Sequence, residues 1–157
     1  MKIRVGQGYD SHALVPDRPF YIGGALIEYD KGALGHSDGD CLLHAITDSL
    51  LGALGKGDIG LWFPDNDPSL KDIRSTKLLK RVLEDSSLPK FEWVNLDLTL
   101  FLNQPKMKPH RQDIIQSISD LIQLDPSRIN LKAKTWEGFQ VQDLISASAT
   151  CLIELKS

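Results

Sequence analysis

The segment SDGDCLLHAITDSLLGALG, residues 37–55, has the pattern of an amphipathic helix and lies at the centre of the predicted fold. Its large apolar side chains recur at the spacing of a helix that buries one face, at Leu42, Leu43, Ile46 and Leu50. Ser37 followed by Asp40 resembles a capping box with Asp in place of Glu, and Gly55 is a typical residue after a helix end. We therefore predict a helix that begins near Ser37 and ends at Leu54.

Alternating apolar and polar residues predict strands on both sides of this helix. The expected strands are residues 3–12, a hairpin over 20–29 that turns at Gly23-Gly24, and residues 94–102, 129–134 and 147–155. Further helices are expected over 75–85 and 114–122, and residues 55–70 are expected to form a loop. Because strands and helices do not alternate strictly, the pattern predicts a single α+β domain over residues 1–157.

Composition excludes several classes of function. The chain has 157 residues, 41% of them hydrophobic and 25% charged, as in ordinary globular domains. A net charge of −3 and a pI near 5.8, with scattered Lys and Arg, argue against nucleic-acid binding. No apolar run approaches the roughly 20 residues that would span a membrane, and the N-terminus starts as a strand rather than as an apolar signal core. Cys41 and Cys151 fit two buried thiols in a reducing compartment, so we expect a cytoplasmic protein.

Asp10, His12 and His44 form a candidate metal site. Residues two apart in a strand point to the same face, so Asp10 and His12 can converge on one ion. His44 lies in the predicted helix, on a polar stripe with Asp40 and Asp48. Two imidazoles and one carboxylate suit zinc or a similar divalent ion and leave one position for substrate. By spacing alone, a turn or surface Asp-His pair and a histidine packed at the edge of the core are the more common explanations of these residues.

Three further segments contain groups suited to phosphate and metal chemistry. His36-Ser-Asp-Gly-Asp40 precedes the helix, whose N-terminus presents free N–H groups to an anion. Lys132-Ala-Lys-Thr-Trp-Glu137 places a hydroxyl and a carboxylate two residues apart at a strand end, where they could bind a phosphate and Mg²⁺. Gly57–Gly60 and Phe63–Asp65 are rich in turn residues. A capped helix, a solvated strand end and a turn are the simpler explanations of the three.

In order and separation, these segments resemble the family of 2-C-methyl-D-erythritol 2,4-cyclodiphosphate synthases. The matching stretches span most of the chain and comprise Gly8–His12, His36–Asp40 with His44–Asp48, Gly57–Gly60, Phe63–Asp65, Gln104–Met107 and Lys132–Glu137. The resemblance implies a mixed β-sheet with three helices packed on one face, assembled as a homotrimer whose sheets surround a central channel. It also implies active sites shared between neighbouring subunits, with Asp58 and Lys106 serving the metal of the adjacent chain.

The implied reaction is a cyclisation that belongs to non-mevalonate isoprenoid precursor synthesis. In 4-diphosphocytidyl-2-C-methyl-D-erythritol 2-phosphate, the 2-phosphate attacks the β-phosphorus and CMP leaves, a phosphorus–oxygen lyase reaction that needs no protein nucleophile. By resemblance, Asp10, His12 and His44 bind Zn²⁺, while Glu137 binds Mg²⁺ or Mn²⁺ and Thr135 the diphosphate. The remaining implied contacts are His36 and Ser37 with the 2-phosphate region, Asp65 with methylerythritol, Asp58 and Gly60 with ribose, and Lys106 with cytosine.

The sequence departs from the family pattern after Glu137. An Arg that is common in the family aligns with Gln142, and a later Glu aligns with Ala149. Both positions are expected to face the trimer channel, so isoprenoid diphosphates are expected to bind there weakly or not at all. Two other functions remain open at this point: a metal-dependent phosphohydrolase using His36, His44 and Asp48, and a nucleotide-binding trimer without catalysis.

Overall fold

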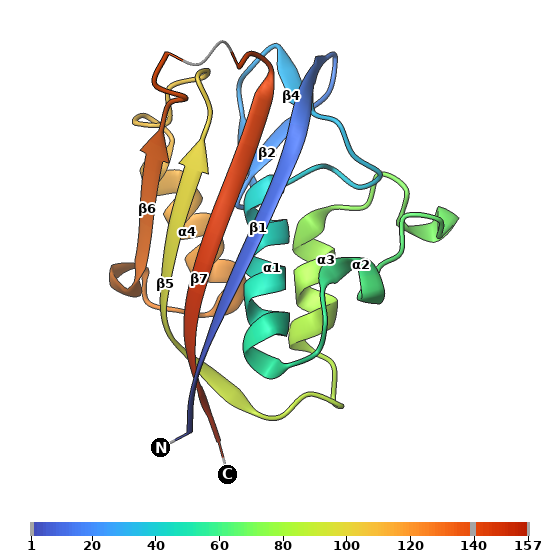
Figure 1. Ribbon diagram of the computed structural model, residues 1–157, viewed down its shortest axis with the longest axis vertical. Helices are drawn as coiled ribbons and strands as arrows, with labels where there is room; N and C mark the ends of the chain where they lie inside the picture. Colours follow the sequence, from blue (N-terminus) through green and yellow to red (C-terminus); the bar gives the residue numbers. More distant parts are fainter. Residues whose placement is uncertain (1, 139–140, 157) are drawn as a thin grey trace.

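A computed structural model describes residues 2–138 and 141–156 and contains one large mixed sheet (Figure 1). Its strand order is β4-β1-β7-β5-β6. Strands β5 and β6 run parallel and the other neighbours are antiparallel. The strand bounds are β1 (Lys2–Pro16), β4 (Lys31–Ala33), β5 (Phe91–Phe101), β6 (Ile129–Lys134) and β7 (Leu144–Leu155). A separate hairpin pairs β2 (Phe20–Ile22) with β3 (Ala25–Ile27), as the Gly23-Gly24 pattern predicted.

Helices α1 (Cys41–Leu54) and α4 (Arg111–Ile122) pack on the sheet, and α3 (Ser75–Leu83) lies beside α1 (Figure 1). A fourth, short helix, α2 (Ile59–Trp62), and the 3-10 turns η1 (Pro68–Leu70) and η2 (Pro126–Arg128) complete the described elements. The prediction of an α+β fold with a mixed sheet and several helices is therefore confirmed. In the described part of the chain, no helix is long and apolar enough to cross a membrane.

Helix α1 packs directly on β1 because two glycines remove the side chains between them. A Cβ built on Gly6 would lie 1.8 Å from the Ser49 carbonyl oxygen, and one on Gly8 would lie 2.0 Å from the Ala45 carbonyl oxygen. Real Cβ atoms do not approach backbone so closely, so only glycine permits this contact. The contact brings the polar stripe of α1 up to the middle of β1.

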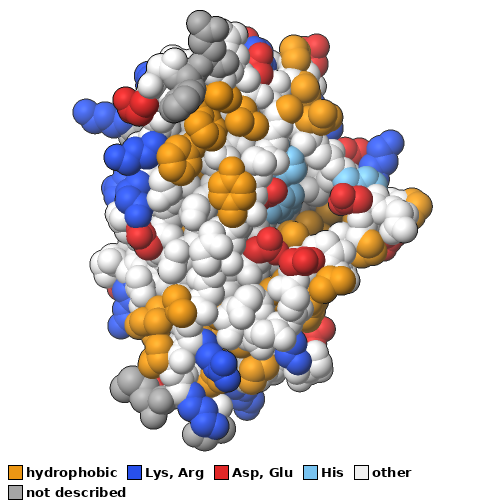
Figure 2. Space-filling view, in the orientation of Figure 1, with side chains coloured by type: hydrophobic (Ala, Val, Ile, Leu, Met, Phe, Trp, Pro, Cys, Tyr) orange, Lys and Arg blue, Asp and Glu red, His pale blue; other side chains and the backbone are white. Residues whose placement is uncertain are grey.

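The hydrophobic core fills the space between the sheet and the helices. Its fully buried side chains come from α1, α4 and the inner faces of the strands, among them Leu42, Leu50, Leu98, Ile114 and Ile153. The outer face of the sheet is open among the described residues, and apolar side chains gather on it (Figure 2). On this face, the side chains of Ile3, Val5 and Tyr9 of β1 are 42, 66 and 56% exposed. A group of exposed apolar side chains of this kind is typical of an interaction surface.

The structure corrects three details of the prediction. Helix α1 begins at Cys41, not near Ser37, because Asp40 is the N-cap: its carboxylate accepts hydrogen bonds from the N–H groups of Leu43, Gly23 and Gly24. Residues 55–70 contain α2 and η1, so they are not a simple loop. Finally, Ala149 is fully buried on the inner face of β7, and the sequence alignment that placed it toward a channel is wrong.

Candidate metal centre

Asp10, His12 and His44 converge at the junction of β1 and α1. The Asp10 Oδ2 atom lies 2.8 Å from His12 Nε2 and 2.9 Å from His44 Nδ1, and the two ring nitrogens are 3.3 Å apart. All three side chains are partly buried. Among the described residues, this is the one group of His, Cys, Asp and Glu side chains whose spacing could hold a metal ion. The predicted convergence of strand and helix is confirmed.

The second nitrogen of each imidazole has its own hydrogen-bond partner. His12 Nδ1 lies 2.7 Å from the carbonyl oxygen of Leu34, which can only accept, so this nitrogen carries the hydrogen. That leaves the lone pair of Nε2 directed at the cluster. His44 Nε2 lies 2.9 Å from Ser75 Oγ and 3.2 Å from Ser37 Oγ. Outer partners of this kind orient histidine ligands toward a metal.

The electrostatics of the cluster favour a bound cation. Burial alone would raise the pKa of Asp10, but hydrogen bonds with His12 and His44 and their charge hold that pKa well below its usual range. Burial lowers the pKa of His12, but its hydrogen bond with Asp10 and the attraction to that carboxylate raise the pKa overall. The carboxylate is therefore ionised at neutral pH, and the site attracts positive charge.

The separation of the two imidazole nitrogens fits a small tetrahedral ion, whereas the Asp10 oxygen lies closer to them, at 2.8 and 2.9 Å. With zinc–nitrogen bonds of about 2.0–2.1 Å, two ligands of a tetrahedral site lie about 3.3 Å apart. The distance between His12 Nε2 and His44 Nδ1 is 3.3 Å. Three protein donors of nitrogen and oxygen type leave the fourth tetrahedral position for a substrate atom. The cluster can thus hold a divalent metal ion with one open position.

A pocket of about 260 Å³ opens beside the cluster. Figure 2 shows its histidine and acidic side chains beside the open face of the sheet. Besides the three candidate ligands, its lining consists of Gly35, His36, Ser37, Ile59, Gly60, Phe63, Asp65, Leu70, Ile73 and Leu78. Four predicted substrate residues (His36, Ser37, Gly60 and Asp65) therefore share one pocket with the candidate metal ligands.

Ile59 and Gly60 line the pocket of their own chain, whereas the neighbouring Asp58 does not. The Asp58 carboxylate caps α2 by accepting a hydrogen bond from the N–H of Leu61. Asp48 on α1 accepts the N–H of Ile59 at 2.7 Å, which fixes the short helix against α1. Asp58 thus lies beside a helix that is anchored to the helix carrying His44 of its own chain, and its role toward the metal of an adjacent chain stays a prediction.

Thr135, Glu137 and Lys106 lie at the other edge of the sheet, beyond the ends of β5 and β6. The Thr135 hydroxyl donates to Glu137 Oε1 at 2.9 Å, and both side chains are solvent-accessible. The Asn103 side chain accepts the N–H of Trp136 at 3.1 Å, which ties this turn to the loop that carries Lys106. Among the residues lining the pocket beside Asp10, none of the three occurs. Within one chain, the predicted site is thus divided between two sheet edges.

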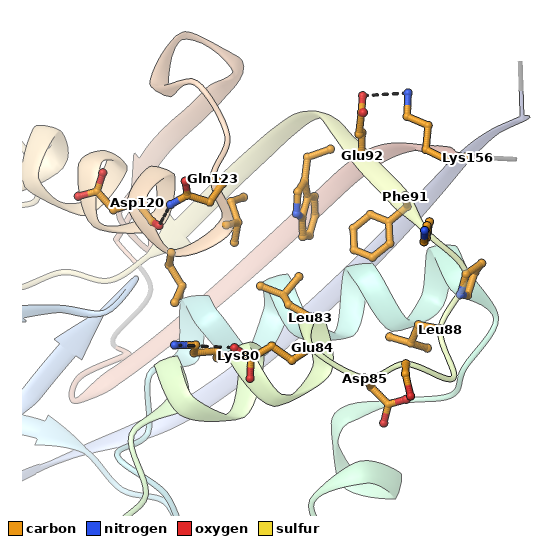
Figure 3. A pocket seen from close by; sticks show the side chains of 16 residues that line it. Lys80, Leu83, Glu84, Asp85, Leu88, Phe91, Glu92, Asp120, Gln123 and Lys156 are labelled. Atoms are coloured by element: carbon orange, nitrogen blue, oxygen red, sulfur yellow. Dashed lines mark hydrogen bonds and ion pairs between the residues drawn. The ribbon is translucent and has the colours of Figure 1, made fainter.

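A larger hollow lies elsewhere, between the ends of α3 and α4 and the start of β5 (Figure 3). Its volume is about 1020 Å³, and its floor contains Leu83, Leu88 and Phe91. The charged side chains at its rim include two ion pairs, Lys80 with Glu84 and Lys156 with Glu92. We place the chemistry in the smaller pocket, because that is where the candidate metal ligands converge.

Two residues of the site were not identified from the sequence. Asp38 lies in the quoted segment His36–Asp40 but received no role, and Ser75 was expected only as the start of a helix. Both are buried and both lie beside His44. They are 37 residues apart, and no local pattern connects them.

Comparison with known proteins supports the resemblance. The sequence model of the YgbB family matches residues 3–154. A 2-C-methyl-D-erythritol 2,4-cyclodiphosphate synthase of Geobacillus sp. (strain WCH70) is 47% identical over 156 residues, which cover 98% of this chain and 99% of the relative. A solved structure of such a synthase in a CDP-bound form is 43% identical, with a TM-score of 0.85 over 96% of this chain and 100% of its own. The bifunctional IspDF from Campylobacter jejuni is 33% identical, with a TM-score of 0.92 over 99% of this chain and 43% of its own.

Proposed function

Because the chain belongs to the YgbB family of 2-C-methyl-D-erythritol 2,4-cyclodiphosphate synthases, we propose that it cyclises 4-diphosphocytidyl-2-C-methyl-D-erythritol 2-phosphate. The products are 2-C-methyl-D-erythritol 2,4-cyclodiphosphate and CMP. The observation that carries this function is the Asp10, His12 and His44 cluster beside a pocket of small-molecule size. The likeness to a CDP-bound synthase agrees with a cytidine nucleotide as ligand.

The reaction requires positioning more than covalent chemistry. An oxygen of the 2-phosphate attacks the β-phosphorus, and the bond from that phosphorus to the oxygen bridging to CMP breaks. His36 and Ser37 line the pocket and would orient the 2-phosphate, while Asp65 would contact the methylerythritol hydroxyls. Gly60 and Asp58 would contact the ribose. A bound Zn²⁺ would supply positive charge to the β-phosphate in this acidic pocket.

We assign Glu137 to a second cation, Mg²⁺ or Mn²⁺, that accompanies the substrate diphosphate. Glu137 lies in the left-handed backbone region with φ of 47°, followed by Gly138 with φ of 84°. A non-glycine residue in that region costs energy that the turn must offset, and such residues gather at ligand-binding sites. The turn presents the Glu137 carboxylate beside the Thr135 hydroxyl, a pair of oxygen donors suited to a hard cation and a phosphate.

We propose a homotrimer with shared active sites. The metal cluster lies on β1 near one edge of the sheet, whereas Glu137, Thr135 and Lys106 follow β5 and β6 at the other edge. A head-to-tail contact that closes as a ring places one edge of each sheet against the opposite edge of the next. The exposed Ile3, Val5 and Tyr9 would then be covered around a central channel. Analytical ultracentrifugation should give the mass of three 17.5 kDa chains.

A phosphohydrolase site of His36, His44 and Asp48 is not favoured. His36 Nε2 lies 3.0 Å from the carbonyl oxygen of Asp67, and the Asp48 carboxylate accepts the N–H of Ile59. These two side chains are thus engaged with backbone groups rather than with His44.

The free, buried thiols of Cys41 and Cys151 agree with a reducing compartment, and we propose the cytoplasm.

Phosphorus NMR tests the proposed reaction directly. The protein is incubated with the substrate, Zn²⁺ and Mg²⁺, and the ³¹P resonances are followed with time. Cyclisation should produce CMP and two coupled resonances of a cyclic diphosphate, with no inorganic phosphate. Release of inorganic phosphate instead would show a hydrolase. If the substrate saturates the protein but its ³¹P resonances do not change with time, the protein binds the nucleotide without catalysis.

A further inference from the structure

Behind the metal cluster, a buried carboxylate is connected to His44 through one hydroxyl group. Ser75 Oγ lies 2.9 Å from His44 Nε2 and also donates a short hydrogen bond to Asp38 Oδ1. Ser75 is 1% exposed and Asp38 8% exposed. We propose that Asp38 and Ser75 are positioning residues, which fix the orientation and tautomer of His44 so that its Nδ1 lone pair faces the metal.

The Asp38 carboxylate is held rigidly by four donors from two segments, the loop before α1 and the start of α3. Oδ1 accepts the Ser75 hydroxyl and the N–H of Asp40, while Oδ2 accepts the Ser75 N–H and Arg74 Nε, each at 3.0 Å. A buried carboxylate is stable only when donors of this kind replace water. Asp38 also satisfies the free N–H at the start of α3, where Arg74 provides no side-chain cap. Its place in the structure is therefore fixed independently of any ligand.

Hydrogen counting determines what the Ser75 hydroxyl does. Its single hydrogen is directed to Asp38, so its oxygen offers only lone pairs to His44. An acceptor at this place requires that His44 Nε2 carries the ring hydrogen. The ionised Asp10 carboxylate, 2.9 Å from Nδ1, can also only accept, so a bound cation would take the place of a hydrogen on Nδ1 and use the lone pair of that nitrogen. The connection from Asp38 through Ser75 thus selects the tautomer that can bind a cation.

Ser37 has a different role, although its hydroxyl also lies near His44 Nε2. Its distance of 3.2 Å is longer than that of Ser75, and Nε2 has one hydrogen to donate. Ser37 Oγ accepts the N–H of Gly39 at 3.3 Å, and the side chain lines the pocket. Its hydroxyl hydrogen is therefore available to a substrate oxygen. Ser75 therefore positions the metal ligand His44, whereas Ser37 faces the substrate.

Zinc affinity and histidine tautomers test this assignment, which depends on the metal site proposed above. The Kd for Zn²⁺ is measured by competition with a chromophoric chelator, and Co²⁺ spectra report the coordination geometry. Ser75→Ala should raise the Kd about 10- to 100-fold, the usual effect of removing an outer partner of a ligand. Ser75→Thr, which keeps the hydroxyl, should restore much of the affinity. Ser119→Ala is the matched control. Ser119 is a buried serine of α4, away from the metal cluster, and its hydroxyl donates to the Leu124 carbonyl oxygen.

The outcomes separate the two proposals. If the unaltered protein binds no Zn²⁺, the metal site and the positioning role both fail. If the unaltered protein binds Zn²⁺ and folded Ser75→Ala binds it equally well, the positioning role alone is wrong. Equal weakening by Ser75→Ala and Ser75→Thr would indicate lost packing, and a larger effect of Ser37→Ala would assign the contact to Ser37. Either result would overturn the role of Ser75.

A measurement on the unaltered protein covers the case in which Ser75→Ala does not fold. Nitrogen-15 NMR of histidine-labelled, zinc-loaded protein should show His44 coordinated through Nδ1 with a hydrogen on Nε2 that exchanges slowly. His12 should show the opposite tautomer, because the Leu34 carbonyl accepts from its Nδ1. A hydrogen on Nδ1 of His44 in the loaded protein would contradict the proposed connection.

Discussion

Replacing Gly8 by alanine should destabilise the protein and displace a metal ligand at the same time. The new Cβ would lie 2.0 Å from the Ala45 carbonyl oxygen, 2.8 Å from the Ser49 nitrogen and 2.9 Å from the Asp48 Cβ. Two of these atoms belong to the backbone of α1, so no side-chain rotation relieves the contact. The helix and the strand must separate.

The size of the effect follows from these distances. Since nonbonded atoms settle at about 3.5 Å, α1 must move by more than about 1 Å relative to β1. Overpacking of this kind costs about 1–3 kcal/mol or more, which lowers the melting temperature by about 2–12 °C for a chain of this size. Metal sites tolerate ligand displacements of only about 0.2 Å, and α1 carries His44. We therefore expect zinc affinity to fall about 100-fold or more, at least as much as the loss of an outer partner.

Gly52→Ala is the matched control for Gly8→Ala. Gly52 is also part of the α1 contact with β1, but a Cβ at this position meets only the Gln7 carbonyl oxygen, at 3.8 Å. Alanine in a helix interior is more stable than glycine by about 0.5–1 kcal/mol, so this variant should melt slightly higher and keep its zinc affinity. Differential scanning calorimetry and chelator competition measure both quantities. If Gly8→Ala has the same melting temperature and the same Kd for Zn²⁺ as the unaltered protein, the close approach of α1 and β1 does not determine the geometry of the metal site.

Four further predictions concern the metal ligands, the shared site and the channel. His12→Ala should lose bound zinc and turnover while keeping its far-ultraviolet circular dichroism, and full zinc occupancy by elemental analysis would remove His12 from the ligand set. Glu137→Gln should keep zinc but lose most activity, because a neutral amide is a poorer ligand for a hard cation; an unchanged dependence of the rate on Mg²⁺ would leave Glu137 as a solvated residue. Mixing these two inactive variants should restore part of the activity if His12 and Glu137 of neighbouring subunits share a site, and no recovery after verified subunit exchange would contradict that sharing. Gln142 offers no positive charge for a channel ligand, so calorimetric titration with geranyl diphosphate, after CMP has saturated the active site, should show little heat; micromolar binding that is lost in Gln142→Ala would refute this.

The sequence by itself determined most of the elements and the candidate metal ligands. Period-3.6 spacing defined α1 up to Gly55, whose φ of 67° ends the helix as expected. Period-two spacing placed Asp10 and His12 on one face of β1, the polar stripe of the predicted helix added His44 as a candidate, and the family resemblance added the reaction. These conclusions depend on neighbours within a few residues or on a whole-chain match, and both are readable without coordinates.

Only the tertiary structure decided which distant groups meet. Asp40 rather than Ser37 caps α1 because its carboxylate also binds the N–H groups of Gly23 and Gly24, which a local pattern cannot reveal. Ala149 was placed on the wrong face because a one-residue error in a strand alignment reverses the direction of every side chain. Asp38 and Ser75 meet behind His44 through packing of α3 on the loop before α1, since a hydrogen bond between residues 37 apart depends on the fold and not on their spacing.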